Sequence, residues 1–139
     1  MTGNSFVDTN ILLYALAHSG DPREARARAF LLTASESEDL WVSSQVQVEF
    51  SANLVRKLGL SGAEALAALA VFEGFGIVPV GSELIERALR AMDRHRLSFW
   101  DSLIVVAALE ANCTTLYSED LQDGMRIEGL RIVNPLKAA

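Results

Sequence analysis

The chain has 139 residues and a formal net charge of −6; half of its residues are hydrophobic and 22% are charged. This balance is typical of one folded domain, expected here over residues 1–139, and it excludes a disordered chain. The longest apolar run, 65–72, is far shorter than the roughly 18–20 residues of a membrane helix. The first residues lack the pattern of a signal peptide, and a single cysteine cannot form an internal disulfide. We therefore expect a cytoplasmic protein with no membrane contact.

Short apolar runs rich in β-branched and aromatic residues alternate with longer segments of helical periodicity. In chain order, these patterns predict strand 5–7, helix 11–17, helix 23–33, strand 40–43, helix 44–58, helix 62–75, strand 77–80, helix 82–94, helix 99–111, strand 115–117 and strand 130–133. Within helix 23–33, Ala25, Ala29 and Leu32 have core spacing. Trp100 is expected in the core, or lining a site beside its neighbour Asp101. Strands separated by helices indicate an α/β fold with a mainly parallel central sheet of four to five strands, flanked by helices.

Four carboxylates are candidate site residues because of where these elements place them. Asp8 comes directly after the first strand and Asp120 shortly after the fourth, and ligands bind beyond the carboxyl ends of parallel strands. Asp101 lies in the first turn of an apolar helix, and Glu49 lies in the helical stretch SSQVQVEFSANL. Each also has a structural alternative: Asp8 as a helix cap, Glu49 as an exposed partner of Asn53 or Arg56, Asp101 as part of a capping box with Ser98, and Asp120 as a turn former.

The four carboxylates together are more specific than any one of them. Two carboxylates about 4 Å apart repel by roughly 4 kcal/mol at an effective dielectric constant near 20, so a fold that gathers several neutralises them with protons or with a divalent cation. These motifs contain no histidine or cysteine, and oxygen ligands alone suit Mg²⁺ or Mn²⁺. Such an ion orients a water molecule, lowers its pKa and brings positive charge to a phosphodiester that an acidic protein would otherwise repel.

The segments DTNIL, QVQVEF, FWDSLIVVAA and LYSEDLQDG, in this order between Phe6 and Pro135, resemble the motifs of PIN-domain ribonucleases. Among these, the chain is similar to VapC-type toxins of toxin–antitoxin pairs. The resemblance implies an endoribonuclease that depends on Mg²⁺ or Mn²⁺, cleaves RNA, forms a homodimer and is silenced by a cognate VapB-type antitoxin.

The resemblance also implies roles for individual residues. Asp8 and Asp101 would be the principal metal ligands, and Glu49 and Asp120 would complete a catalytic quartet with them. Ser118 is a possible secondary residue of the site, as is Asp123, whose spacing of three residues from Asp120 departs from the two residues common in the family. The Thr9–Asn10 pair is expected to shape the turn after the first strand.

Two other functions stay open at this point. One is a PIN-domain nuclease that processes RNA outside a toxin pair, which a neighbouring antitoxin gene would distinguish. The other is a Mg²⁺-binding signalling or binding module without catalysis. A receiver domain of that kind needs adjacent acids after its first strand and a lysine near its last, whereas Thr9 and Asn10 follow Asp8, and the only lysines are Lys57 and Lys137.

Overall fold

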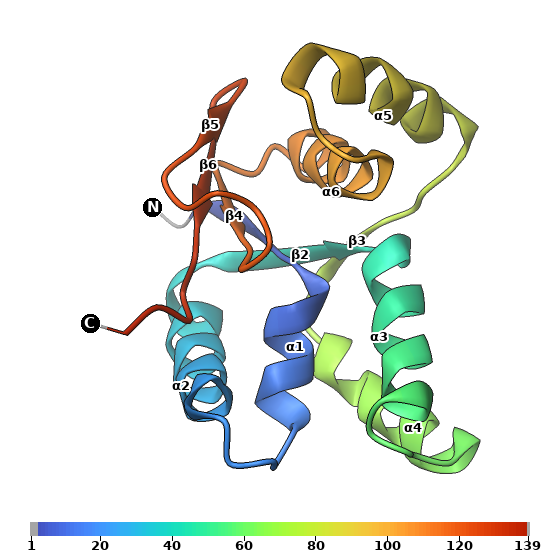
Figure 1. Ribbon diagram of the computed structural model, residues 1–139, viewed down its shortest axis with the longest axis vertical. Coiled ribbons are helices and arrows are strands. Elements are labelled where there is room, and N and C mark those ends of the chain that lie inside the picture. Colours follow the sequence, from blue (N-terminus) through green and yellow to red (C-terminus); the bar gives the residue numbers. More distant parts are fainter. Residues whose placement is uncertain (1–2, 139) are drawn as a thin grey trace.

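A six-stranded sheet runs through the middle of the computed structural model, which describes residues 3–138 (Figure 1). The strands lie in the order β3-β2-β1-β4-β6-β5, with the bounds β1 Asn4–Val7, β2 Asp39–Ser43, β3 Gly76–Val78, β4 Thr115–Tyr117, β5 Arg126–Ile127 and β6 Leu130–Val133. Neighbouring strands are parallel except for β5, which is antiparallel to β6. The mainly parallel α/β sheet is confirmed. The expected number of four to five strands misses β5, because two residues are too few to show an alternating pattern.

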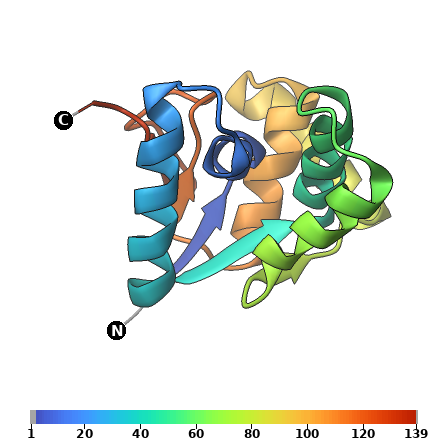
Figure 2. The ribbon, with the colours of Figure 1, turned by 90° about the horizontal axis from the view of Figure 1, so that it is seen from below.

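Helices cover both faces of the sheet. Figures 1 and 2 show α1 to α4 on one side and α5 and α6 on the other. Their bounds are α1 Thr9–Leu16, α2 Pro22–Ser37, α3 Ser44–Arg56, α4 Gly62–Ala68, α5 Ser82–His95 and α6 Phe99–Glu110. Among the described residues, no helix has the length and hydrophobicity needed to cross a bilayer.

The predicted helix 62–75 is wrong in its second half. α4 ends at Ala68, and a 3-10 turn, Leu69–Phe72, follows it. In this tighter turn the ring of Phe72 packs edge-on against Phe50 and Phe75, with centroids 5.2 and 6.2 Å apart. Aromatic packing of this kind is a tertiary contact, which overrides the local helix propensity of an alanine-rich segment.

The buried face of α2 also differs from the predicted one. The structure buries Glu24, Ala27 and Ala34 and leaves Leu32 68% exposed, so the expected core stripe is wrong. Glu24 tolerates burial because its carboxylate accepts three hydrogen bonds from the loop that precedes the helix. A hydrophobicity pattern cannot reveal a buried carboxylate that is satisfied in this way.

Two elements bring the candidate site residues to one edge of the sheet. β1 is a central strand whose Phe6 and Val7 are fully buried, and α1 begins two residues after Val7, with only Asp8 between them. α6 is buried along residues 102–108, as its apolar sequence predicts, and Ser98 caps it. The first turns of both helices therefore lie beside the carboxyl ends of the parallel strands.

Candidate active site

Asp8 follows β1 directly and is only 7% exposed. Its Oδ1 accepts a hydrogen bond from the backbone N–H of Thr9 (2.7 Å), and its Oδ2 accepts one from the Ser118 hydroxyl (2.8 Å). Burial raises the pKa of Asp8 from its ordinary 3.8 to about 6; the two hydrogen bonds oppose this rise, and the charges of Asp120 and Glu49 add to it. Asp8 is therefore a helix cap and, at the same time, a buried carboxylate whose charged form burial disfavours.

Asp120 lies in the loop after β4 and is held by the first turn of α1. Both of its carboxylate oxygens accept hydrogen bonds from Nδ2 of Asn10, at 3.1 and 2.9 Å. Burial raises the pKa of Asp120, the charge of Asp101 raises it further, and the hydrogen bond from Asn10 opposes both. Asp120 thus lies at the same strand–helix junction that Asp8 caps.

Glu49 lies on α3, and its carboxylate Oε1 accepts a hydrogen bond from the Thr9 hydroxyl (3.3 Å). Burial raises the pKa of Glu49, hydrogen bonds from Thr9 and Gln45 oppose this, and the charges of Asp120 and Asp101 add to it. The predicted pair between the Glu49 carboxylate and Asn53 is not formed. The Asn53 amide donates to the backbone oxygen of Glu49 instead (2.8 Å).

Asp101 lies in the first turn of α6, where its backbone N–H donates to the hydroxyl of Ser98 (3.1 Å). This is the cap that the sequence predicts, but the carboxylate itself is close enough to raise the pKa of both Glu49 and Asp120. The structure therefore brings the four predicted carboxylates together. We call them the carboxylate cluster: Asp8, Glu49, Asp101 and Asp120.

The two possible secondary residues behave differently. Ser118 is fully buried at the end of β4, and its hydroxyl donates to Asp8 while it accepts from the backbone N–H of Leu121 (3.4 Å). Asp123 does not join the cluster. Its carboxylate accepts hydrogen bonds from the backbone N–H of Asn134 (2.7 Å) and from Lys137 Nζ (2.9 Å), and both lower the pKa of Asp123.

Sequence reasoning underestimates Thr9 and Asn10, whose side chains contact Glu49 and Asp120 rather than only shaping a turn. Their positions directly after Asp8, at the start of a helix, are the signal that could have assigned these contacts. Both side chains supply hydrogen-bond donors, and donors that face carboxylates favour the charged form.

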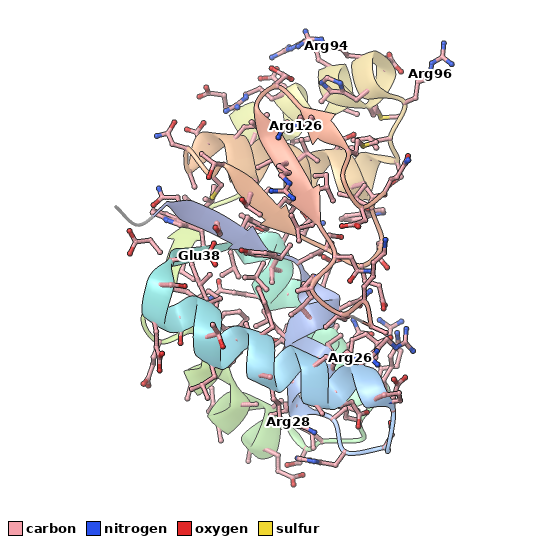
Figure 3. All side chains as sticks on the ribbon, turned by 90° about the vertical axis from the view of Figure 1, so that its left-hand side faces the viewer. Arg26, Arg28, Glu38, Arg94, Arg96 and Arg126 are labelled. Carbon is pink, nitrogen blue, oxygen red and sulfur yellow. The ribbon has the colours of Figure 1, made fainter. Side chains whose placement is uncertain are left out.

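Sequence reasoning also misses Arg23, near the start of α2. Its guanidinium donates to both carboxylate oxygens of Glu119 (3.2 and 3.1 Å), binds Asp21 (2.7 Å) and lies 4.5 Å from the centroid of the Tyr14 ring. Because Glu119 directly precedes Asp120, the contact between Arg23 and Glu119 connects the loop after β4 to α2. Figure 3 shows the direction of this helix: Arg26 lies near its beginning, toward the edge of the sheet where β1 ends, and Glu38 lies just past its other end.

A cavity of about 520 Å³ adjoins the cluster and shares Glu49 with it. Trp100 lines this cavity and is 61% exposed, so its expected place in the core is wrong, whereas the alternative that it lines a site beside Asp101 agrees with the structure. The ring packs edge-on against Phe99, with centroids 5.4 Å apart.

The donor atoms of the cluster suit a hard divalent cation. In the part of the chain that the structure describes, no three acidic, histidine or cysteine side chains are close enough together to hold an ion as they stand. The atoms that meet at this edge are carboxylate, hydroxyl and amide oxygens, which are ligands that Mg²⁺ and Mn²⁺ prefer. Burial, with a smaller contribution from neighbouring carboxylates, raises the pKa of Asp8, Glu49 and Asp120, and a cation would favour their charged forms. The chemistry of the donor atoms therefore suits such an ion.

Comparison with known proteins identifies relatives of this fold. The family model of the PIN domain matches residues 5–122.

Among solved structures, the chain is similar to VapC20 of Mycobacterium tuberculosis, a sarcin–ricin-loop-cleaving toxin, with 28% identity, a TM-score of 0.66 and coverage of 84% of this chain and 89% of that one. A toxin–antitoxin complex from Klebsiella pneumoniae is 19% identical, with a TM-score of 0.70 and coverage of 94% and 97%. VapBC2 from Rickettsia felis, bound to a promoter DNA fragment, is 17% identical, with a TM-score of 0.67 and coverage of 93% and 96%. The last two likenesses concern the fold alone. A search of curated proteins finds no match.

Proposed function

This chain belongs to the PIN-domain family, and we propose that it is a divalent-metal-dependent endoribonuclease that acts as the toxin of a toxin–antitoxin pair. The observation that carries the proposal is Asp8: a buried carboxylate, with a pKa of about 6, in the field of other carboxylates at the edge of a parallel sheet. A purely structural cap has no need of this surrounding charge, because one acidic side chain satisfies the helix end.

Each side chain has a distinct part in the proposed hydrolysis of an RNA phosphodiester. Asp8 and Asp101 would hold Mg²⁺ or Mn²⁺, and Glu49 and Asp120 would complete the site directly or through water. When bound, such an ion would supply Lewis-acid chemistry that lowers the pKa of a water molecule. Ser118 and the backbone N–H of Thr9 orient Asp8, while Asn10 orients Asp120 and the Thr9 hydroxyl orients Glu49.

The decisive experiment measures cleavage of an RNA panel, with tRNA and structured rRNA fragments included, in Mn²⁺, in Mg²⁺ and in EDTA. The wild-type protein should cleave at least one RNA only when metal is present, and Asp8→Asn and Asp101→Asn should abolish cleavage while both variants stay folded. Asp93→Asn is the matched control, because it removes an exposed carboxylate of α5. Retained cleavage in both cluster variants contradicts the assignment of the site.

The toxin role is supported by the likeness to VapC20, which is itself a toxin. We propose a VapB-type antitoxin as the partner and a homodimer as the assembly. Expression of the wild-type chain should arrest growth, co-expression of the product of a neighbouring reading frame should restore it, and light scattering should give the mass of a dimer. RNA cleavage without toxicity would favour a PIN-domain nuclease of RNA processing instead.

A further inference from the structure

The hairpin of β5 and β6 presents two arginines side by side on the face of the sheet that carries α2. Arg126 is directly opposite Arg131 in the antiparallel register, so the two side chains point to the same face. Arg131 is aligned with Thr115 of β4, and Thr115 is aligned with Ser5 of β1. The Ser5 hydroxyl donates to Glu38, just past the end of α2. The register therefore places both arginines on the α2 face.

The sheet is open at this place. In Figure 3, α2 passes below the hairpin rather than over it, and Arg126 lies on the hairpin. The other face of the hairpin is apolar, because Ile127, Leu130 and Ile132 are at most 3% exposed. Arg126 and Arg131 are both exposed. The hairpin thus has one face in the core and one basic face in solvent.

The two positive charges have no acidic partner in the part of the chain that the structure describes. Neither guanidinium forms an ion pair or a hydrogen bond with another described side chain. Glu38 already accepts from the Tyr117 hydroxyl, and Asp123, in the loop before β5, binds Lys137. Like charges directly opposite each other destabilise a strand pair, because their Cβ atoms are only about 5 Å apart. The donors of both guanidinium groups are available to an anion from outside the chain.

We propose that Arg126 and Arg131 bind the sugar–phosphate backbone of the RNA substrate at a distance from the carboxylate cluster. The inference rests on the proposed ribonuclease function and adds to it a second contact surface. It requires RNA that extends several nucleotides to one side of the cleaved bond. Guanidinium groups bind phosphate oxygens through paired hydrogen bonds, and two adjacent arginines suit neighbouring phosphates. Such contacts position a nucleic acid without reading its sequence.

One RNA strand can contact both places. Arg131 is aligned with Thr115, and Asp120 follows Thr115 by five residues, so at most about 17 Å separates the Cα atoms of Thr115 and Asp120. A stacked strand advances about 3.4 Å per nucleotide, so about five nucleotides cover this distance. The arginines therefore lie within reach of an RNA whose cleaved bond is at the cluster.

A phosphate backbone fits this surface better than an acidic protein segment does. The chain has a net charge of −6, so most of its surface repels a polyanion. A substrate with one charge per nucleotide needs local positive charge to bind such a protein, and the gain comes from the counterions that each contact releases. A protein partner has no such requirement, because apolar contacts are sufficient to bind it.

The test measures binding of a fluorescent oligouridylate of about 20 nucleotides in EDTA, where cleavage is absent, over a range of salt concentrations. Each phosphate contact of a single strand contributes about 0.7 to the slope of log Kobs against log salt. Arg126→Gln/Arg131→Gln should reduce that slope by about 1.4 and weaken binding roughly tenfold or more at about 50 mM salt. Arg126→Lys/Arg131→Lys should keep most of the slope. Arg28→Gln/Arg56→Gln is the control, because it removes the same charge from two other exposed arginines.

Cleavage provides the second measurement. With an RNA that the wild-type protein cleaves, Arg126→Gln/Arg131→Gln should raise KM roughly tenfold and leave kcat unchanged, because the contact is the same in the ground state and the transition state. Shortening that RNA to about two nucleotides on each side of the cut should raise KM for the wild-type protein but not for the double variant. The melting temperature of the variant should be unchanged or higher, since a like-charge pair is removed.

Three results would overturn the proposal. The first is a double variant that binds RNA with the affinity and salt dependence of the control while the wild-type protein cleaves RNA, which would leave the ribonuclease function standing. The second is a double variant with normal RNA binding that no longer binds the product of the neighbouring reading frame, which would assign this face to a protein partner. The third is a wild-type protein that neither binds nor cleaves any RNA, which would remove the proposed function together with this inference.

Discussion

Asp8 has two roles with opposite demands on its charge. As the cap of α1 it favours a charged carboxylate, because the helix N-terminus carries partial positive charge. As a buried group beside Glu49 and Asp120 it favours the neutral acid, and burial prevails, with a pKa of about 6. The folded protein therefore binds a proton at Asp8 between about pH 4 and pH 6 that the unfolded chain releases.

Asp8→Asn should accordingly stabilise the metal-free protein at neutral pH. The rise in pKa from 3.8 to about 6 corresponds to roughly 3 kcal/mol of lost stability above pH 6, and the amide gives up one hydrogen bond worth about 1 kcal/mol. We expect a gain of about 1–2 kcal/mol in the free energy of unfolding at pH 8, and this gain should vanish as the pH falls to 4. Thermal melts of both proteins in EDTA across this range measure it. A gain that does not depend on pH would mean that Asp8 is charged throughout.

Ser118 and Ser102 form a matched pair of buried hydroxyls. Ser118 donates to a carboxylate, whereas the hydroxyl of Ser102 has no partner. Ser118→Ala should lower the free energy of unfolding by about 1–3 kcal/mol at pH 8 and reduce cleavage, because Asp8 loses a hydrogen bond that favours its charged form. Ser102→Ala should be neutral or stabilising by up to about 1 kcal/mol. Urea titrations of the two variants compare them directly, and equal losses would contradict this account.

At the scale of elements, the β2–β3 pair shows how one glycine sets a strand position. Gly76 lies opposite Trp41 in the register, and a methyl group on Gly76 would overlap the Trp41 ring. Gly76→Ala should therefore destabilise the protein by about 1–3 kcal/mol. Gly62→Ala, at the first position of α4 with open space around it, should be neutral or stabilising by up to about 1 kcal/mol. Melting temperatures of the two variants test the contrast.

The link between α2 and the loop after β4 yields a second prediction at this scale. Arg23 is 40% exposed, so Arg23→Gln should cost under about 1 kcal/mol of stability, and less at high salt. Cleavage should fall roughly tenfold or more, because the loop that carries Asp120 loses its anchor at Glu119. Arg28→Gln is the control, since Arg28 donates to the backbone oxygens of Ala15 and Ala17 at the end of α1. Equal rates in the two variants would mean that Arg23 does not position the site.

The elements differ in how far the sequence predicts them. α6, which Ser98 caps, is predicted to within a residue, whereas the helix predicted over 23–33 extends to Ser37. The failures have tertiary causes: Glu24 is buried because a loop satisfies its carboxylate, and α4 ends early because Phe72 turns toward other aromatic rings. Neither cause is visible in a window of neighbouring residues. β5 fails for a simpler reason, since two residues carry no pattern.

At the scale of the whole molecule, topology explains why most of the cluster is predictable. Asp8 and Asp120 follow parallel strands, β1 and β4, that are neighbours in the sheet, so their convergence follows from the strand order. Asp123 lies three residues further along the same loop, where Asn134 and Lys137 bind its carboxylate. The cavity beside Glu49 was not predictable, because Trp100 and Gln45 come from different helices whose packing no local pattern gives.

Divalent metal should stabilise the folded chain as a whole, because the cluster exists only when β1, α3, α6 and the loop after β4 are assembled. At a concentration ten times its Kd, Mg²⁺ or Mn²⁺ should add about 1.4 kcal/mol to the free energy of unfolding. The rise in melting temperature over EDTA should disappear in Asp101→Asn. A shift of the same size in that variant would indicate that the ion binds elsewhere.

The pairing of β1 with β4 has a consequence for how the protein is made. Val7 lies beside Tyr117 in the sheet, so β1 can pair with β2 early in synthesis but meets its second partner, β4, only about 110 residues later. At roughly 5–20 residues per second, translation takes several seconds or more to reach Ser118 and Asp120. Until then the growing polypeptide holds Asp8, Glu49 and Asp101 but has nothing to orient Asp8 through a side chain. The complete carboxylate cluster can therefore form only when synthesis of the chain is almost finished.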